Sequence, residues 1–307
     1  MTPPPPGNRN GLDRVVLGDN QFFAVNHMSQ ERSFAQAERF ATDEAILGVM
    51  ATARDLGVRS MMLHSHPRAE ALCDELRKDT AGWNGFGLYP CIPYAFKYVM
   101  ALNEQGFYPV LRDQVKKAGV GTSLSLFLKG GVGLARGDYH RLIEVLVDLE
   151  LQIFRDLPVR AVFLHNVVVD LLLALEIDGM LRMYADHVRS KGLRPGFGTL
   201  NLPRLVDRLR AERVEDAVIM TAVNPIGFFM NPSREACEIV LQDAGLQVMA
   251  MSILASGSVP ASRAFPYAAS FPAVKSFLFG ASRRQTLEAS LNLLGHPAPS
   301  LSQPGPA

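Results

Sequence analysis

The stretch Val58-Arg-Ser-Met-Met-Leu-His-Ser-His-Pro67 is a short apolar run that ends in two histidines. Side chains on a strand alternate between its two faces, so an extended conformation places His64 and His66 on one face, with Met62 behind them. If that face lines the inside of a barrel, two imidazoles lie at the mouth of the barrel. The alternative interpretation is a strand whose last residues are simply solvated at the edge of a sheet.

Apolar segments of this kind recur along the chain and alternate with segments of helical periodicity. The helix predicted from Thr42 to Leu56 has Thr42 as its expected N-cap, and Gly57 ends it directly before the strand. Further helices are predicted at 70–78, 139–157, 171–191, 202–213, 234–244 and 284–294. Strands are predicted at 14–17, 58–66, 86–93, 160–166, 195–200, 217–224, 247–253 and 277–280.

Eight such strands, each followed by helix, predict an α/β protein of the (β/α)8 TIM-barrel class. The alternative is an open doubly wound sheet, which needs a glycine-rich phosphate loop after its first strand, and Gly18-Asp-Asn-Gln21 is not such a loop. The length of 307 residues suits one barrel with insertions. We expect a single domain at 12–295 with a helical insertion around 99–157, and disordered tails at 1–11 and 296–307.

The composition narrows the class of partner. Basic residues number 31 and acidic residues 30, so no nucleic-acid partner is expected. No apolar run approaches the ~20 residues that span a bilayer, so no membrane association is expected. The three cysteines, Cys73, Cys91 and Cys237, match no metal-ligand spacing, and they favour a reducing, cytoplasmic location. We expect a small-molecule substrate, and the sequence does not indicate an oligomeric state.

Polar residues follow nearly every predicted strand, where a barrel of this class has its active site. Strand ends meet solvent and often turn on Asn or Ser, so polarity there is a weak signal, but three of the 7 histidines lie at such ends. The candidate catalytic residues are His64, His66, Tyr94, Lys97 and His165. The candidate substrate-binding residues are Asp19, Asn20, Gln21 and Asn224.

Four stretches in the second half of the chain, Arg194–Asn201, Val223–Pro225, Val248–Gly257 and Phe279–Glu288, are similar to the segments at strands five to eight of the aldo-keto reductases. In addition, Leu164-His-Asn166 resembles the leucine-histidine of strand four in that family, and Asp55-Leu-Gly-Val-Arg59 precedes strand two as it does there. The aldo-keto reductases are NADP-dependent (β/α)8 oxidoreductases. The resemblance therefore implies the barrel fold and nicotinamide chemistry.

Members of this family reduce carbonyl groups with a tyrosine acid that is supported by lysine, aspartate and histidine. The histidine carries over as His165, whereas His64-Ser65-His66 replaces the strand-two aspartate segment and no tyrosine follows it. On the cofactor side, the resemblance implies an NADP site made by Asn166, Asn201, Ser252, Gly280, Ser282, Arg283 and Arg284. The helix that opens after Ser282 supports a phosphate there, because free N–H groups and the helix dipole favour an anion, although an ordinary helix start with solvated arginines has the same pattern.

Three functions stay open. The first, which we favour, is an NADP-dependent oxidoreductase acting on a small carbonyl compound or alcohol, with His165 polarising the carbonyl oxygen and Tyr94 or a histidine donating the proton. The second is a non-redox hydrolase or lyase that uses His64, His66 and His165, with or without a divalent metal. The third is a barrel that binds a ligand without catalysis.

Overall fold

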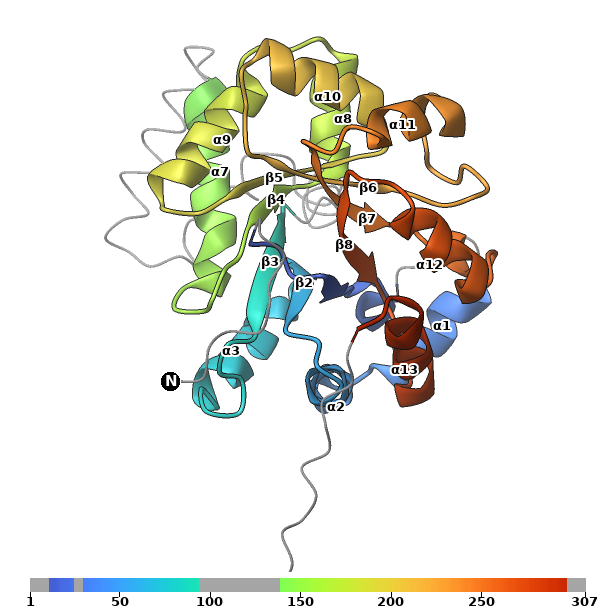
Figure 1. Ribbon diagram of the computed structural model, residues 1–307. Coiled ribbons are helices and arrows are strands. Elements are labelled where there is room, and N and C mark those ends of the chain that lie inside the picture. The colour runs from blue at the N-terminus through green and yellow to red at the C-terminus, as the bar shows by residue number, and fades with distance from the viewer. Residues whose placement is uncertain (1–10, 25–29, 94–138, 297–307) are drawn as a thin grey trace, which may run out of the picture.

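Eight parallel strands close into a barrel in chain order in the computed structural model, which describes residues 11–24, 30–93 and 139–296 (Figure 1). Strand β1 pairs with β2 on one side and with β8 on the other, and this pairing closes the sheet. The predicted (β/α)8 class is therefore confirmed. The strands are β1 (Val15–Leu17), β2 (Ser60–His64), β3 (Gly87–Ile92), β4 (Val162–Leu164), β5 (Pro195–Thr199), β6 (Val218–Ala222), β7 (Gln247–Met251) and β8 (Val274–Phe279).

Helices surround the barrel and cover its outer face (Figure 1). They are α1 (Gln30–Arg39), α2 (Asp43–Asp55), α3 (Ala69–Lys78), α7 (Tyr139–Leu151), α8 (Asn166–Ala174), α9 (Met180–Ser190), α10 (Leu202–Ala211), α11 (Arg234–Leu241), α12 (Ala261–Ala269) and α13 (Arg284–Leu293). Short 3₁₀ turns follow β1, α7 and β7: η1 (Asn20–Phe23), η2 (Gln152–Phe154) and η3 (Ala255–Gly257). Thr42 caps α2 as predicted, because its hydroxyl accepts a hydrogen bond from the Ala45 N–H at 3.3 Å.

Two predictions of helices need correction. The single helix expected at 171–191 is two helices, α8 and α9, because Glu176 and Gly179 between them have positive φ values of 55° and 77°. A left-handed residue cannot continue a right-handed helix. Helix α12 was not predicted at all, and it contains Pro266, a residue that usually argues against a helix interior.

The interior of the barrel is filled by side chains that alternate with those packed under the helices. Met62 points inward between Met61 and Leu63, which join the outer core, and Tyr89 and Cys91 point inward from β3 in the same way. His64 continues the inward series of Met62 at the end of β2. The inner core is made of Leu12, Val16, Met62, Tyr89, Cys91, Ala161, Phe163, Val218, Met220, Met249 and Leu278.

Gly196 of β5 leaves room inside the barrel for the ring of Phe163 on β4. A Cβ atom at position 196 would lie 2.7 Å from that ring. We therefore expect Gly196→Ala to lower the free energy of unfolding by about 1–3 kcal/mol, the usual cost of overpacking a core. Urea denaturation measures this change. The matched control is Gly48→Ala in α2, where nothing lies within 4 Å of an added Cβ, and we expect it to be neutral or to stabilise the protein by up to about 1 kcal/mol. Equal effects of the two substitutions would contradict this account.

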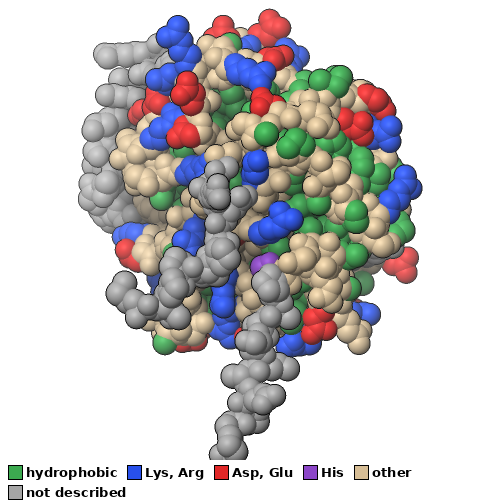
Figure 2. Space-filling view, viewed as in Figure 1, with side chains coloured by type: hydrophobic (Ala, Val, Ile, Leu, Met, Phe, Trp, Pro, Cys, Tyr) green, Lys and Arg blue, Asp and Glu red, His purple; other side chains and the backbone are tan. Residues whose placement is uncertain are grey.

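The predicted insertion at 99–157 lies largely outside the described residues, apart from α7 and η2, which precede β4. The two predicted tails also lie outside them, except for Gly11 and His296. In the part of the chain that the structure describes, no helix has the length and apolar character needed to cross a bilayer. Both basic and acidic side chains appear on the face shown in Figure 2, in keeping with the net charge of +1.

Candidate active site

Asp19 and His64 form the centre of the site at the C-terminal ends of β1 and β2. The Nδ1 atom of His64 lies 2.9 Å from Oδ1 and 3.0 Å from Oδ2 of Asp19, and the backbone N–H of His64 donates to Oδ2 at 2.7 Å. The Asp19 side chain is only 2% exposed. A carboxylate that accepts both bonds fixes the orientation of the ring and keeps a proton on Nδ1. Asp19 therefore positions His64, whereas the sequence suggested that it binds substrate.

Cys91 adds a thiol to this pair. It is fully buried near the end of β3, directly opposite His64 in the strand register. Its sulfur and a ring nitrogen of His64 lie within 4.8 Å of each other. The result is a carboxylate, an imidazole and a thiol close together at the barrel mouth.

The surroundings of His64 favour its protonated form. Burial of the ring opposes the charge, but the Asp19 carboxylate and, after it, Cys91 outweigh the burial and raise the pKa of His64 well above its usual range. An imidazolium at neutral pH can donate a proton to a bound molecule. His64 is thus a candidate general acid.

His165 stands beside this pair at the end of β4 in the opposite charge state. Burial, together with the nearby positive charge of His64, lowers the pKa of His165 to about 4, so the ring is neutral. Its Nδ1 accepts a hydrogen bond from the Val167 N–H at 3.2 Å, which caps α8. The single ring proton must then lie on Nε2. The two rings are 5.5 Å apart between centroids, so a neutral hydrogen-bond donor lies next to a protonated one.

His66 does not join this group, which corrects the prediction that it lies beside His64 on one strand face. Strand β2 ends at His64, and the alternation of a strand does not continue beyond it. The ring of His66 stacks instead on Phe23 of η1, with centroids 4.0 Å apart, and its Nδ1 accepts the Arg68 N–H at 3.1 Å. Burial lowers the pKa of His66 to about 4, so this ring is neutral too.

The described residues contain a potential metal-ligand group, but it is not the one predicted. His64, Cys91 and His165 offer ligand atoms within 4.8 Å of one another, so Cys91 replaces His66. A metal needs an imidazole nitrogen that carries no proton. The bond from Val167 to Nδ1 of His165 puts the proton on Nε2, and the environment of His64 favours its charged form. The protonation states of the two histidines suit proton transfer better than metal binding.

The other predicted substrate-binding residues differ in what their side chains contact. Asn20 is exposed at the start of η1. Gln21 is buried, and its amide donates to the carbonyl oxygen of Gly18 at 2.7 Å. Asn224 is fully buried, and its amide bonds the backbone of Phe228 and Ser252, so it holds the loop after β6; its part in substrate binding stays a prediction. Tyr94 and Lys97 lie outside the described residues.

The predicted cofactor residues lie at the ends of four strands. Asn166 is the first residue of α8, and Asn201 caps α10 by accepting the Arg204 N–H. Ser252 follows β7 with a positive φ of 50°. At the start of α13, Arg283 and Arg284 are exposed, no side chain caps the helix, and its first turn carries no acidic residue. Free N–H groups and two guanidinium groups at this end of α13 suit a phosphate.

Two further carboxylates near the mouth were not predicted. Glu150 of α7 is buried and accepts the hydroxyl hydrogen of Ser65, directly after β2. Asp170 of α8 accepts the Thr199 hydroxyl at 2.5 Å and the Leu200 N–H at 2.9 Å, and burial raises its pKa. Both carboxylates bind a helix to the end of a strand. For Asp170 the signal in the sequence is a single acid within an apolar helix, whereas α7 carries two further acids, Glu144 and Asp148, and does not single out Glu150.

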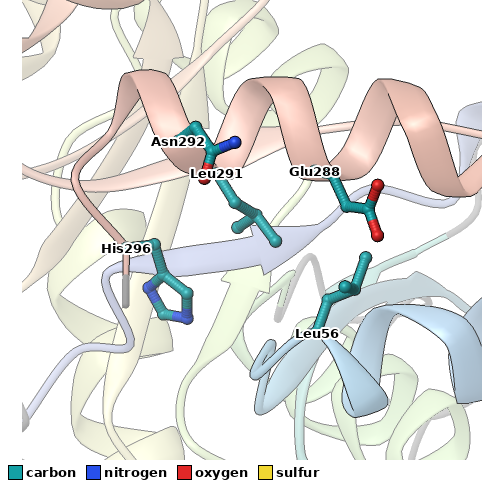
Figure 3. Close-up of a pocket in the computed structure, with 5 residues that line it drawn as sticks. All are labelled: Leu56, Glu288, Leu291, Asn292 and His296. Carbon is teal, nitrogen blue, oxygen red and sulfur yellow. The ribbon is translucent and has the colours of Figure 1, made fainter. Parts of the chain in front are cut away.

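A separate pocket lies between the end of α2 and the second half of α13 (Figure 3). It is lined by Leu56, Glu288, Leu291, Asn292 and His296. Leu56 directly precedes the segment that leads into β2, so the pocket is near the N-terminal end of that strand. In barrels of this class that end serves stability rather than chemistry.

No protein-family model matches this chain, and no curated protein sequence matches it. Solved structures do match it. One from Pseudomonas aeruginosa, assigned to the aldo-keto reductases, is 16% identical with a TM-score of 0.57 and covers 94% of this chain and 93% of its own. A second, assigned as a 2,5-diketo-D-gluconic acid reductase B, is 12% identical with a TM-score of 0.55 and covers 95% and 85%. An aldo/keto reductase from Brucella melitensis is 9% identical with a TM-score of 0.51 and covers 91% and 88%.

These similarities span nearly the whole of each chain, and they establish the fold. The chain is a (β/α)8 barrel with the architecture of the aldo-keto reductases. The resemblance seen in the sequence is confirmed at this level. The mouth of the barrel in this chain carries a histidine, a cysteine and a second histidine at the ends of three successive strands.

Proposed function

We propose that this protein is an oxidoreductase of the aldo-keto reductase type, which reduces a small carbonyl compound with NADPH. The observation that carries the proposal is the pair of histidines at the mouth of the barrel. His165 is neutral and offers an N–H, whereas His64 is held in its charged form by Asp19. Their different environments make His64 an acid and His165 a neutral hydrogen-bond donor.

Each of these side chains has a defined part in the reduction. The Nε2–H group of His165 donates to the carbonyl oxygen and stabilises the negative charge that develops there. His64 then transfers its Nε2 proton to that oxygen, and Asp19 holds the ring in place and stabilises its charge. In this proposal His64 replaces the tyrosine acid that the sequence lacks. The shielded environment of Asp19, which is only 2% exposed, strengthens these interactions.

The start of α13 is where the cofactor phosphates would bind, with Arg283 and Arg284 supplying positive charge. NADPH, when bound, supplies the hydride for the reduction. An added Cβ at Gly280 would lie 2.1 Å from Oε1 of Gln21, so Gln21 fills the space beside Gly280 from within the protein. Asn201 already uses its side-chain oxygen to cap α10. The cofactor proposal therefore rests on Arg283 and Arg284, since the groups beside Gly280 and Asn201 are taken up by contacts within the protein.

Binding of NADPH, followed by its fluorescence, tests the cofactor assignment. We expect the double variant Arg283→Ala and Arg284→Ala to weaken binding about 100-fold or more, because each lost charge-assisted bond to a phosphate contributes about 1.5 kcal/mol or more. Arg210→Ala is the matched control, because Arg210 on α10 forms an exposed ion pair with Asp243, as Arg284 does with Glu288, but lies away from the start of α13. Absence of binding at millimolar NADPH would overturn the redox assignment.

Two other parts of the proposal rest on the sequence. A small-molecule substrate follows from the composition and from the position of the site at the barrel mouth. A cytoplasmic location follows from the cysteines, which are unpaired in the described structure, where all three are buried.

A further inference from the structure

The proposed reduction makes no use of the Cys91 thiol. Within the described part of the chain, this sulfur lies with the nitrogens of His64 and His165 in a group whose atoms are within 4.8 Å of one another. Cys91 is the direct partner of His64 in the register of β2 and β3, and Nδ1 of His64 is bonded to Asp19. A nucleophile, an imidazole beside it and a carboxylate that orients the imidazole are the three groups that activate serine and cysteine in covalent catalysis.

The other two cysteines have different surroundings. Cys73 is buried within α3, and burial raises the pKa of its thiol to about 12. Cys237 donates to the carbonyl oxygen of Asn231 at 3.3 Å, and burial raises its pKa to about 11. A thiol reacts through its thiolate, so these two residues are poor nucleophiles at neutral pH. They serve as internal references for Cys91.

His165 supplies the fourth part. Its Nε2–H is left to donate because Nδ1 accepts from Val167. When a nucleophile adds to a carbonyl carbon, negative charge moves onto the carbonyl oxygen, and a fixed donor at that point stabilises it. The neutral ring of His165 is therefore suited to the oxygen of a tetrahedral adduct as well as to that of a carbonyl.

We infer that Cys91 adds reversibly to the carbonyl carbon of an aldehyde bound at this site. This inference rests on the proposed function for the presence of a carbonyl compound at the mouth. The S–C bond forms as the π bond of the carbonyl breaks; His64 gives its proton to the carbonyl oxygen and then takes up the proton that leaves Cys91. The product is a hemithioacetal, and no oxidant, reductant or cofactor takes part.

Burial of Cys91 selects among carbonyl compounds. Its side chain has no exposed surface and lies beside that of His64, its register partner, which is itself 15% exposed. An aldehyde carries its carbonyl carbon at the end of the molecule and can present it to a recessed sulfur. A ketone has carbon on both sides of the carbonyl, and it is also the less reactive partner for a thiol.

Alkylation by iodoacetamide tests the reactivity of the thiol in the full-length protein without cofactor. The rate at each cysteine is measured by mass spectrometry of peptides. We expect Cys91 to react at least about tenfold faster than Cys73 and Cys237 at pH 7. His64→Gln and Asp19→Asn are expected to slow the alkylation of Cys91 by about tenfold or more. Cys237→Ser, which keeps a donor for the carbonyl oxygen of Asn231, is expected to leave the alkylation rate of Cys91 unchanged. Circular dichroism confirms that each variant is folded.

Protection by an aldehyde tests the adduct itself. Butanal is expected to slow the alkylation of Cys91, and butan-1-ol, which has the same chain length but no carbonyl, is not. Equal protection by the two compounds, a rate at Cys91 no higher than at the other cysteines, or no alkylation of Cys91 in the folded protein would each overturn the inference. Because NADPH is absent throughout, these outcomes are independent of whether the protein binds the cofactor.

Discussion

Replacement of His64 by glutamine is expected to lower kcat/KM for carbonyl reduction by roughly 10²–10⁴-fold, the usual contribution of a general acid. The amide of glutamine can still donate to Asp19, so the variant keeps a hydrogen bond to the carboxylate that orients residue 64. It cannot transfer a proton to the carbonyl oxygen. The measurement is the steady-state rate of NADPH oxidation with a carbonyl substrate of the wild-type protein.

The pH profile separates a loss of the acid from a general loss of structure. His64 has a pKa well above 6.5, so the wild-type rate should be level near neutral pH and fall as the pH rises through that pKa. The variant should lack this decline. His187→Gln is the control, because His187 contacts Asp148 on the outer helices at 2.7 Å. An unchanged alkaline decline in His64→Gln would show that another group is the proton donor.

The fold could be predicted from the sequence because each strand and each helix carries its own periodicity. The break between α8 and α9 could not, since it depends on a left-handed backbone at Glu176, a residue type that rarely adopts one. The position of His66 was missed for a related reason. Alternation predicts side-chain direction only within a strand, and β2 ends two residues before His66.

Cys91 shows what the linear sequence lacks. Its contact with His64 depends on the register between β2 and β3, in which the two residues are direct partners. Inward alternation from Tyr89 would have placed Cys91 at the mouth of β3, and this signal was available in the sequence. A search for metal-ligand spacing along the chain could not find it, because its partners come from other strands. Asp19 was identified from the sequence, but its role as the partner of His64 needed the structure.

Acid is expected to destabilise the fold through His165 in particular. The pKa of His165 is about 4 in the folded protein and about 6.5 in the unfolded chain. Between these two pH values the unfolded chain binds a proton at His165 and the folded protein does not. Stability is therefore complete above pH 6.5 and is lost as the pH falls toward 4. The loss from this residue amounts to roughly 2–3 kcal/mol at pH 4. His64 acts in the other direction, because its raised pKa stabilises the fold below pH 6.5 and that contribution is lost as the pH rises through the folded value.

His165→Asn removes the contribution of residue 165 to the loss of stability in acid. The asparagine side chain can still cap α8 by accepting the Val167 N–H, but it cannot take up a proton. Urea denaturation of both proteins at pH 7 and pH 4 gives the two losses in the free energy of unfolding. Carboxylates titrate alike in the two proteins, so the difference between the losses belongs to residue 165. We expect the variant to lose roughly 2–3 kcal/mol less than the wild-type protein. Equal losses would mean that the His165 ring is protonated as easily in the folded protein as in water, and would contradict the lowered pKa on which its assignment as a neutral donor rests.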